Sequence, residues 1–249
     1  VKDISIGHKE NYYDDFKVEP TLIRKLSTMG PSMTVADING DGLEDVYIGG
    51  TESGAGAFLV QSKDGTYVSK SQKSMFTDTD SRQFYKDDAA CIFIDVNNDG
   101  FPDLIKAKAG NEKNLSSKMP GLECFLNDGA GKFDYSPDVF PILEGEYSVV
   151  CSTDFDSDGW PDLFVGGRSI PGRYPLAPKS YLLKNNRGVY KDVSESLGIP
   201  DSLGLVKDAK WVDLNSDGRQ DLVVVGEYMA PQIFLFEKKK FIRATQDLS

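Results

Sequence analysis

The chain has 249 residues, 39% of them hydrophobic, and its 39 Asp and Glu outnumber 28 Lys and Arg to leave a net charge of −11. Length and hydrophobic content allow a sizeable buried core and argue against a disordered chain. The negative charge argues against binding to nucleic acid or to an anionic membrane surface, and the lack of any run of about 18 apolar residues argues against membrane insertion.

One motif recurs four times along the chain. It reads D-x-[DN]-x-D-G-x-x-D and occupies residues 37–45, 95–103, 154–162 and 213–221. The first aspartates of successive copies stand 58, 59 and 59 residues apart. Such even spacing predicts a tandem array of units about 59 residues long.

Short runs of apolar, β-branched and aromatic residues recur in each unit and predict strands. In the first unit they are 33–36, 46–48, 58–60 and a fourth run near Tyr67. The later units repeat them at 89–94, 104–105, 124–126 and near Phe133; at 147–151, 163–165, 181–183 and near Tyr190; and at 209–212, 222–225, 233–235 and near Phe241. Each motif is therefore expected to form the turn between the first two strands of its unit.

The units are too thin to bury both faces of a sheet alone, which is typical of propeller blades that pack face to face. We predict an all-β fold, a β-propeller built of four-stranded blades. The expected blades span residues 32–87, 88–146, 147–205 and 206–249, after a lead-in segment, 1–31, that can hold the outer strand of a preceding blade. The apolar first strands are expected at the buried inner position of each blade.

The ends of the chain bear on whether such a propeller closes. The chain starts at Val1 with no leader or initiating Met, so we expect it to have been processed or excised from something longer. The four repeats are expected to be part of a larger propeller, joined to further blades or domains. A closed four-bladed propeller is the alternative.

The motif brings oxygen-bearing groups together. Asp or Asn at positions 1, 3 and 5, the carbonyl of position 7 and the Asp at position 9 can point toward one centre, and Gly at position 6 permits the turn. Oxygen ligands without His or Cys select calcium or magnesium, and a flexible loop with many oxygens favours calcium. The predicted ligands are Asp37, Asn39, Asp41, Leu43 and Asp45; Asp95, Asn97, Asp99, Phe101 and Asp103; Asp154, Asp156, Asp158, Trp160 and Asp162; and Asp213, Asn215, Asp217, Arg219 and Asp221.

We expect about four calcium ions, one in each loop and structural in role, with the four aspartates of 154–162 binding most tightly. An EF-hand would need Glu at position 12, where this chain has Ile48, Lys106, Val165 and Val224. Ordinary solvated turns are the other alternative. The motif positions hold 13 of the 39 acids, however, and clustered carboxylates are costly unless a cation neutralises them.

These loops, set between apolar strands, resemble FG-GAP/VCBS repeats, which occur in integrin α-subunit propellers and in many secreted bacterial proteins. Residues 8–11, 30–31, 166–175 and 225–228 add a resemblance to the cartilage-acidic-protein-like VCBS proteins. The resemblance covers nearly the whole chain. It implies a calcium-bearing propeller that is secreted, periplasmic or on the cell surface.

The sequence leaves two classes of function open. The single histidine, His8, precedes the first blade, so no Ser-His-Asp or Cys-His arrangement can form among the repeats. The leading hypothesis is a noncatalytic binding or scaffolding module for a glycan or protein ligand, with roles in adhesion or carbohydrate binding. The alternative is a polysaccharide-active enzyme, a lyase or hydrolase, with its site on one propeller face.

The long segment that follows the second strand of the third unit carries the candidate ligand contacts. Arg168, Arg173 and Tyr174 lie in it, and a guanidinium with an aromatic ring suits an acidic sugar. The alternative for these side chains is to brace one blade against the next.

Overall fold

The structure is a computed structural model that describes residues 12–28, 30–51, 56–70, 87–110, 121–143 and 145–245. The resembling stretch 8–11, the single His8 and most of the segment that follows the second strand of the second unit lie outside the described residues.

The described residues form four antiparallel sheets of four strands, each a meander of neighbours in sequence. The strands of the first two sheets are β1 Met33–Ala36, β2 Asp45–Ile48, β3 Ala57–Gln61 and β4 Tyr67–Lys70, then β5 Asp87–Ile94, β6 Asp103–Ala109, β7 Leu122–Asn127 and β8 Phe133–Tyr135. The third and fourth sheets hold β9 Glu146–Thr153, β10 Asp162–Ser169, β11 Tyr181–Asn185 and β12 Tyr190–Asp192, then β13 Leu205–Val212, β14 Asp221–Glu227, β15 Gln232–Glu237 and β16 Lys240–Arg243.

Helical structure is minor in the described part of the chain. It consists of α1 Asp15–Val18, α2 Ser194–Leu197 and the 3₁₀ turn η2 Pro137–Val139. No described helix has the length and apolar character needed to cross a bilayer. The prediction of an all-β fold is confirmed, and every predicted strand is present.

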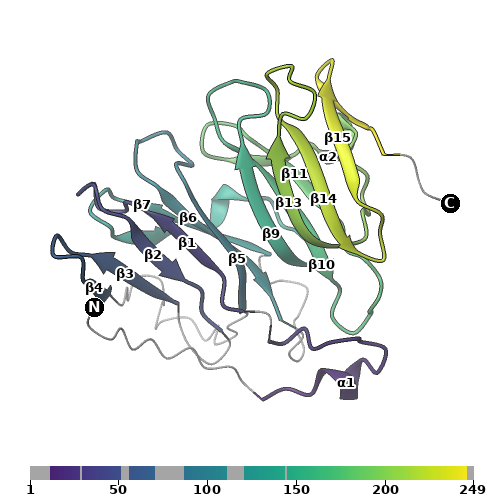
Figure 1. Cartoon of the computed structure of the whole chain (residues 1–249), viewed down its shortest axis with the longest axis horizontal. Coiled ribbons are helices and arrows are strands. Elements are labelled where there is room, and N and C mark those ends of the chain that lie inside the picture. Colours follow the sequence, from purple (N-terminus) through teal and green to yellow (C-terminus); the bar gives the residue numbers. More distant parts are fainter. Residues whose placement is uncertain are drawn as a thin grey trace.

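The four sheets stand side by side in an open arc, like blades of a propeller (Figure 1). The first strands β1, β5, β9 and β13 are innermost, and those of neighbouring sheets contact one another. The first and fourth sheets lie at opposite ends of the arc, so the blades do not close into a ring. The alternative of a closed four-bladed propeller is therefore wrong for this arrangement.

The first strands are less buried than the sequence suggested. Every residue of β10 is buried, whereas most residues of β5 are half-buried and those of β1 alternate between exposed and half-buried. The reason is position. The second strands of the two middle sheets are covered on both faces, whereas the innermost strands border the open centre of the arc, and β1 also belongs to an end sheet with an exposed outer face. Their apolar character suits the inner position without complete burial.

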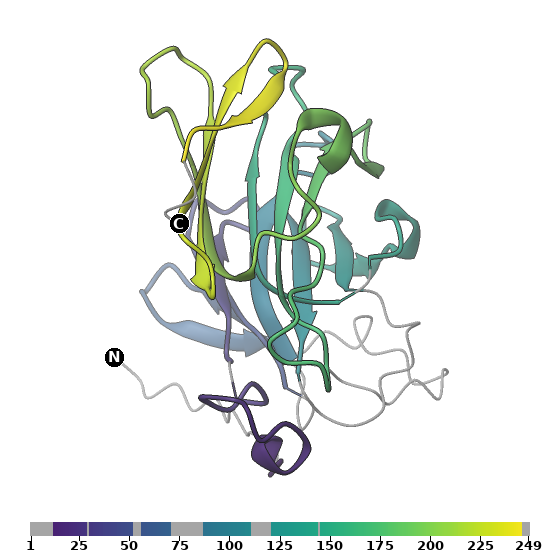
Figure 2. The same ribbon diagram turned by 90° about the vertical axis from the view of Figure 1, so that its right-hand side faces the viewer.

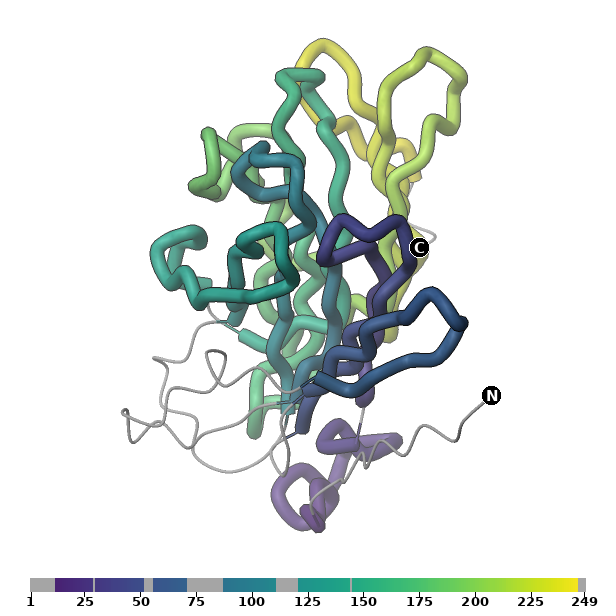
Figure 3. The backbone as a smooth tube through the Cα atoms, turned by 90° about the vertical axis from the view of Figure 1, so that its left-hand side faces the viewer, coloured from purple at the N-terminus to yellow at the C-terminus, as the bar shows by residue number. Residues whose placement is uncertain are grey.

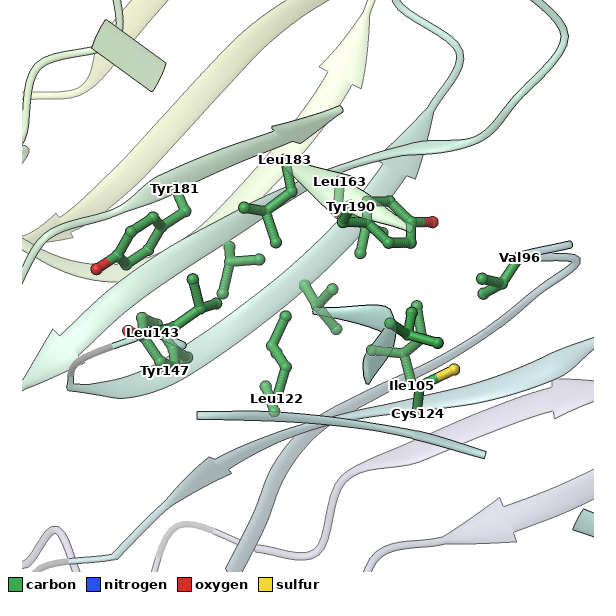
Figure 4. Close-up of a cluster of buried hydrophobic side chains, with 14 residues drawn as sticks. Val96, Ile105, Leu122, Cys124, Leu143, Tyr147, Leu163, Tyr181, Leu183 and Tyr190 are labelled. Atoms are coloured by element: carbon green, nitrogen blue, oxygen red, sulfur yellow. The ribbon is translucent and has the colours of Figure 1, made fainter. Parts of the chain in front are cut away.

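The hydrophobic core lies between the sheets. Three clusters of buried side chains occur, one at each junction of neighbouring sheets. In the middle cluster Ile105, Leu122 and Cys124 of the second sheet face Leu163, Leu183 and Tyr190 of the third (Figure 4). Each blade thus depends on its neighbour for burial, as expected for units that are too thin to fold alone.

The outer faces of the two end sheets remain apolar. Val35 pairs with Val46 on the outer face of the first sheet, and Val225 and Ile242 lie on the outer face of the fourth, where they are exposed. Scattered exposed apolar side chains are ordinary, but a sheet face is expected to be covered.

The lead-in segment crosses to the far end of the arc. Its described part holds α1 and turns but no strand, and it lies beneath the sheets at the end opposite the Asp loops (Figures 2 and 3). Glu19 accepts a hydrogen bond from the backbone N–H of Tyr174 at 2.8 Å, and Arg24 pairs with Glu227 at 2.7 Å. These contacts tie the segment to the third and fourth sheets.

Candidate functional site

The four Asp motifs form equivalent turns between the first and second strands of each sheet, all at the same end of the strands. In each turn the first Asp accepts backbone N–H groups from positions 5 and 6. In the second loop Asp95 accepts from Asp99 at 3.1 Å and from Gly100 at 2.8 Å. The same two bonds recur at Asp37, Asp154 and Asp213.

The glycine at position 6 has the backbone conformation that the motif requires. Its φ is +84° at Gly42, +92° at Gly100, +86° at Gly159 and +82° at Gly218. Other residues rarely adopt this left-handed region. The turn brings the N–H of the glycine onto the first carboxylate, which explains why a glycine stands at this position in every copy.

The aspartate at position 9 is fully buried in all four loops. Asp103 accepts the N–H of Val96 at 2.9 Å and that of Asn127 at 2.8 Å. Asp45, Asp162 and Asp221 make the same two bonds, one to position 2 of the loop and one to the third strand. This carboxylate therefore joins the turn to the body of the sheet, a role that the motif alone did not reveal.

Burial shifts the titration of aspartates at this position, Asp103 and Asp162 among them. Desolvation raises the pKa of Asp103 to about 6 and that of Asp162 to about 7, although backbone N–H groups work in the opposite direction. The carboxylates at positions 1 and 5 of the second loop also raise the pKa of Asp103. A cation in the loop would favour the ionised form of all these groups.

The third loop brings three carboxylates together. Asp154, Asp156 and Asp162 each offer an oxygen, and these oxygens lie within 4.8 Å of one another. Calcium binds oxygens at 2.3–2.6 Å, so two of its ligands stand at most about 5 Å apart. The donor set therefore fits a calcium ion. The other loops have Asn at position 3 and cannot form this triad of carboxylates.

A lysine also reaches the third loop. Lys184 on β11 contacts the Asp156 carboxylate and lies 2.8 Å from Asp158. Both contacts raise the pKa of Lys184, although burial works against them. In each sheet the equivalent position is the residue just before the one whose backbone N–H donates to the buried Asp. These residues in the other sheets are Val60, Leu126 and Leu235. Of these four equivalent third-strand positions, only the one beside the loop with four aspartates thus carries a cationic side chain.

The remaining predicted ligands hold the turns in shape. Asn39, Asn97 and Asn215 each accept the N–H of the position-5 Asp at 3.0 Å. The position-5 carboxylates Asp41, Asp99, Asp158 and Asp217 accept the N–H groups of Leu43, Phe101, Trp160 and Arg219. The loops are also tied to the next blade, because Asn127 donates to the carbonyl of Ile38 at 2.8 Å and Asn185 to that of Val96 at 2.9 Å.

The predicted ligand contacts lie at the opposite end of the sheets. Arg168 is only 2% exposed and pairs with Glu227 of the fourth sheet at 3.0 Å. The ring of Tyr174 meets that of Tyr228 edge to face at 6.0 Å, while Arg173 is exposed. Arg168 and Tyr174 thus brace the third blade against the fourth, and the part of all three residues in ligand binding stays a prediction.

A buried network of charges joins the first two sheets at this end. Lys108 pairs with Asp88 at 2.5 Å and with Glu123 at 3.2 Å, and Lys106 joins the same two carboxylates. The hydroxyl of Tyr47 donates to Asp88 at 2.8 Å. Sequence reasoning missed this network because the other units have apolar residues or glycine at the two lysine positions.

The comparisons with known proteins agree with the geometry of the repeats. The family model for the FG-GAP-like repeat matches residues 37–106, 95–165 and 154–224, and each match runs from one Asp loop through the next. The chain belongs to the FG-GAP-like repeat family. The resemblance expected from the motif is therefore confirmed for this FG-GAP-like repeat protein.

Solved structures give a more distant likeness. The biofilm matrix protein Bap1 of V. cholerae matches with a TM-score of 0.41 and 13% identity over 87% of this chain. The chain spans 30% of the length of that protein. No curated protein matches the chain.

Proposed function

We propose that this FG-GAP-like repeat chain is a calcium-stabilised, noncatalytic binding module that acts outside the cytoplasm. The observation that carries the metal assignment is the triad of Asp154, Asp156 and Asp162, with oxygens within 4.8 Å of one another in a turn that the other loops repeat. Membership of the family supports further blades in a longer chain, and so does the apolar outer face of each end sheet.

The residues that would hold the ions are those at positions 1, 3, 5 and 9 of each loop, with the carbonyl of position 7. A bound calcium ion would neutralise the clustered carboxylates and fix the first turn of each blade. The loop also carries the carbonyls that accept from Asn127 and Asn185 of the following blade. A rigid turn would therefore hold neighbouring blades in register as well.

Thermal unfolding with and without a chelator tests the structural role of calcium. A site filled at 100 times its Kd stabilises the native state by about 2.7 kcal/mol, which corresponds to about 5–11 °C in Tm for a chain of this size. We expect a fall of at least this amount when the calcium is chelated, and no restoration by an equal concentration of magnesium. An unchanged Tm would overturn the assignment.

The noncatalytic role is tested by a glycan array read together with a turnover assay on uronic-acid polymers. We expect retention of a ligand without release of products. Release of shorter saccharides would show instead a polysaccharide-active enzyme.

A further inference from the structure

A cavity of about 520 Å³ opens between the third and fourth sheets, at the end opposite the Asp loops. Its walls come from the β10–β11, β12–β13 and β14–β15 connections and from the end of β16. Leu203, Leu205 and Gln232 are buried residues of its lining. The volume is in the usual range for small-ligand sites.

The cavity is lined by an exposed tyrosine that a second tyrosine supports. Tyr228 lines it and is 66% exposed. Its φ of +54° is rare for a residue other than glycine, and its ring is fixed by the edge-to-face contact with Tyr174 and by a hydroxyl contact at 3.4 Å. A strained, exposed and supported aromatic ring is a feature of binding surfaces more than of packing.

A glycine also lines the cavity. A Cβ on Gly204 would lie 2.6 Å from the Cβ of Met229, and the φ of Gly204 is +110°. Only glycine allows the β12–β13 and β14–β15 connections to approach this closely. The two connections are therefore in close contact where they line the cavity.

Cations gather beside the cavity in a chain whose net charge is −11. Arg243 is the charged side chain among the described residues that line the cavity. Next to Tyr228, the carboxylate of Glu227 is shared by Arg24 at 2.7 Å, Arg168 at 3.0 Å and Lys207 at 3.7 Å. Three cations thus surround one carboxylate, and the Nε and Nη1 atoms of Arg168 have no hydrogen-bond partner.

We propose that this cavity binds a short acidic saccharide. The guanidinium of Arg243 would take a carboxylate of the sugar, and the exposed face of Tyr228 would take a sugar ring. Gln232, whose amide donates to the carbonyl of Ala230 at 3.1 Å, and Ser202 supply groups for sugar hydroxyls. The assignment rests on the proposed function as a binding module and names its ligand class and location.

Calorimetric titration with a galacturonic acid tetrasaccharide, in saturating calcium, tests the proposal. We expect saturable binding, with at least tenfold weaker binding of the methyl-esterified tetrasaccharide. Tyr228→Ala and Arg243→Gln should each weaken binding tenfold or more. The matched controls Tyr12→Ala and Arg187→Gln, which remove an exposed Tyr and an exposed Arg elsewhere, should leave it unchanged.

Several outcomes would overturn the proposal. They are absence of binding by the acidic tetrasaccharide, equal binding of the ester, equal binding of hexa-aspartate, and full affinity in both cavity variants. Tm with and without chelator, measured on the same samples, keeps the two proposals separate. Lost saccharide binding with a normal calcium effect refutes only the cavity assignment, whereas an absent calcium effect refutes the proposed function.

Discussion

Lys184 makes the third loop a test of how a protein side chain competes with a metal ion. In the structure its ammonium group contacts Asp156 and Asp158, and all three side chains are about a third exposed. A calcium ion must displace this ammonium group to use both carboxylates. We therefore predict that Lys184→Leu, which restores the apolar type found at Leu126 and Leu235, increases the calcium affinity of this loop.

The magnitude follows from the two ion pairs. Partly exposed ion pairs contribute about 0.2–1 kcal/mol each, so displacing Lys184 reduces the binding free energy of calcium by about 0.4–2 kcal/mol. Removing that competition should lower Kd by about 2- to 30-fold. The metal-free variant should also have a lower Tm, because four aspartates lose their neighbouring cation. The effect of calcium on Tm should accordingly be larger in the variant.

Terbium luminescence offers a direct assay, because Trp160 lies in the third loop and can sensitise a bound ion. Titration with calcium displaces terbium and gives the affinity, and Trp160→Phe checks that the signal comes from this loop. The control is Lys191→Leu, which removes the same charge from the strand position paired with Lys184. Equal or weaker calcium binding by Lys184→Leu would refute the reasoning and assign Lys184 to support of the loop.

Three further predictions concern buried charges. Asp103→Leu leaves the N–H groups of Val96 and Asn127 without an acceptor, and at about 1–3 kcal/mol each it should lower the free energy of unfolding by about 2–6 kcal/mol in urea. Lys108→Met leaves Asp88 buried with one cation fewer and should cost about 3–5 kcal/mol. Because burial raises the pKa of Asp103 to about 6, its neutral form stabilises the metal-free fold below about pH 4. That contribution is lost as pH rises through about 6, so the urea midpoint of chelated protein should fall across this window.

Matched variants separate these effects from general damage. Asp103→Asn keeps one side-chain acceptor, so it should cost less than Asp103→Leu and should flatten the pH dependence. Lys240→Met, at an exposed strand position, is the control for Lys108→Met and should change stability little. A urea midpoint that rises with pH in the chelated protein, or a Lys108→Met variant as stable as the parent, would contradict the reasoning.

The strands and the Asp loops were predictable because both repeat. A spacing of about 59 residues placed all four loops, and apolar runs placed the strands in order. The ligand chemistry of positions 1, 3 and 5 is equally local. The motif therefore carries the turn and its oxygen donors within nine residues.

What the sequence did not reveal depends on contacts between units. Lys184 lies 22 residues from Asp162 along the chain, and its position becomes informative only when the third strands are aligned on their donor to the buried Asp. Lys106 and Lys108 pair with carboxylates on other strands, Glu123 on β7 and Asp88 on β5. The cavity needs three connections to converge, which no periodicity encodes. The partial exposure of the first strands follows from the open arc.

The buried aspartate at position 9 has a consequence for how such arrays evolve. Its two hydrogen bonds use protein atoms alone, so each turn keeps an anchor that does not depend on an ion. Substitutions at positions 1, 3 or 5 can then abolish one ion site while the sheet around it persists. A chain of this kind can consequently bind fewer ions than it has blades. Repeats that have lost their ion site should still retain the Asp at position 9.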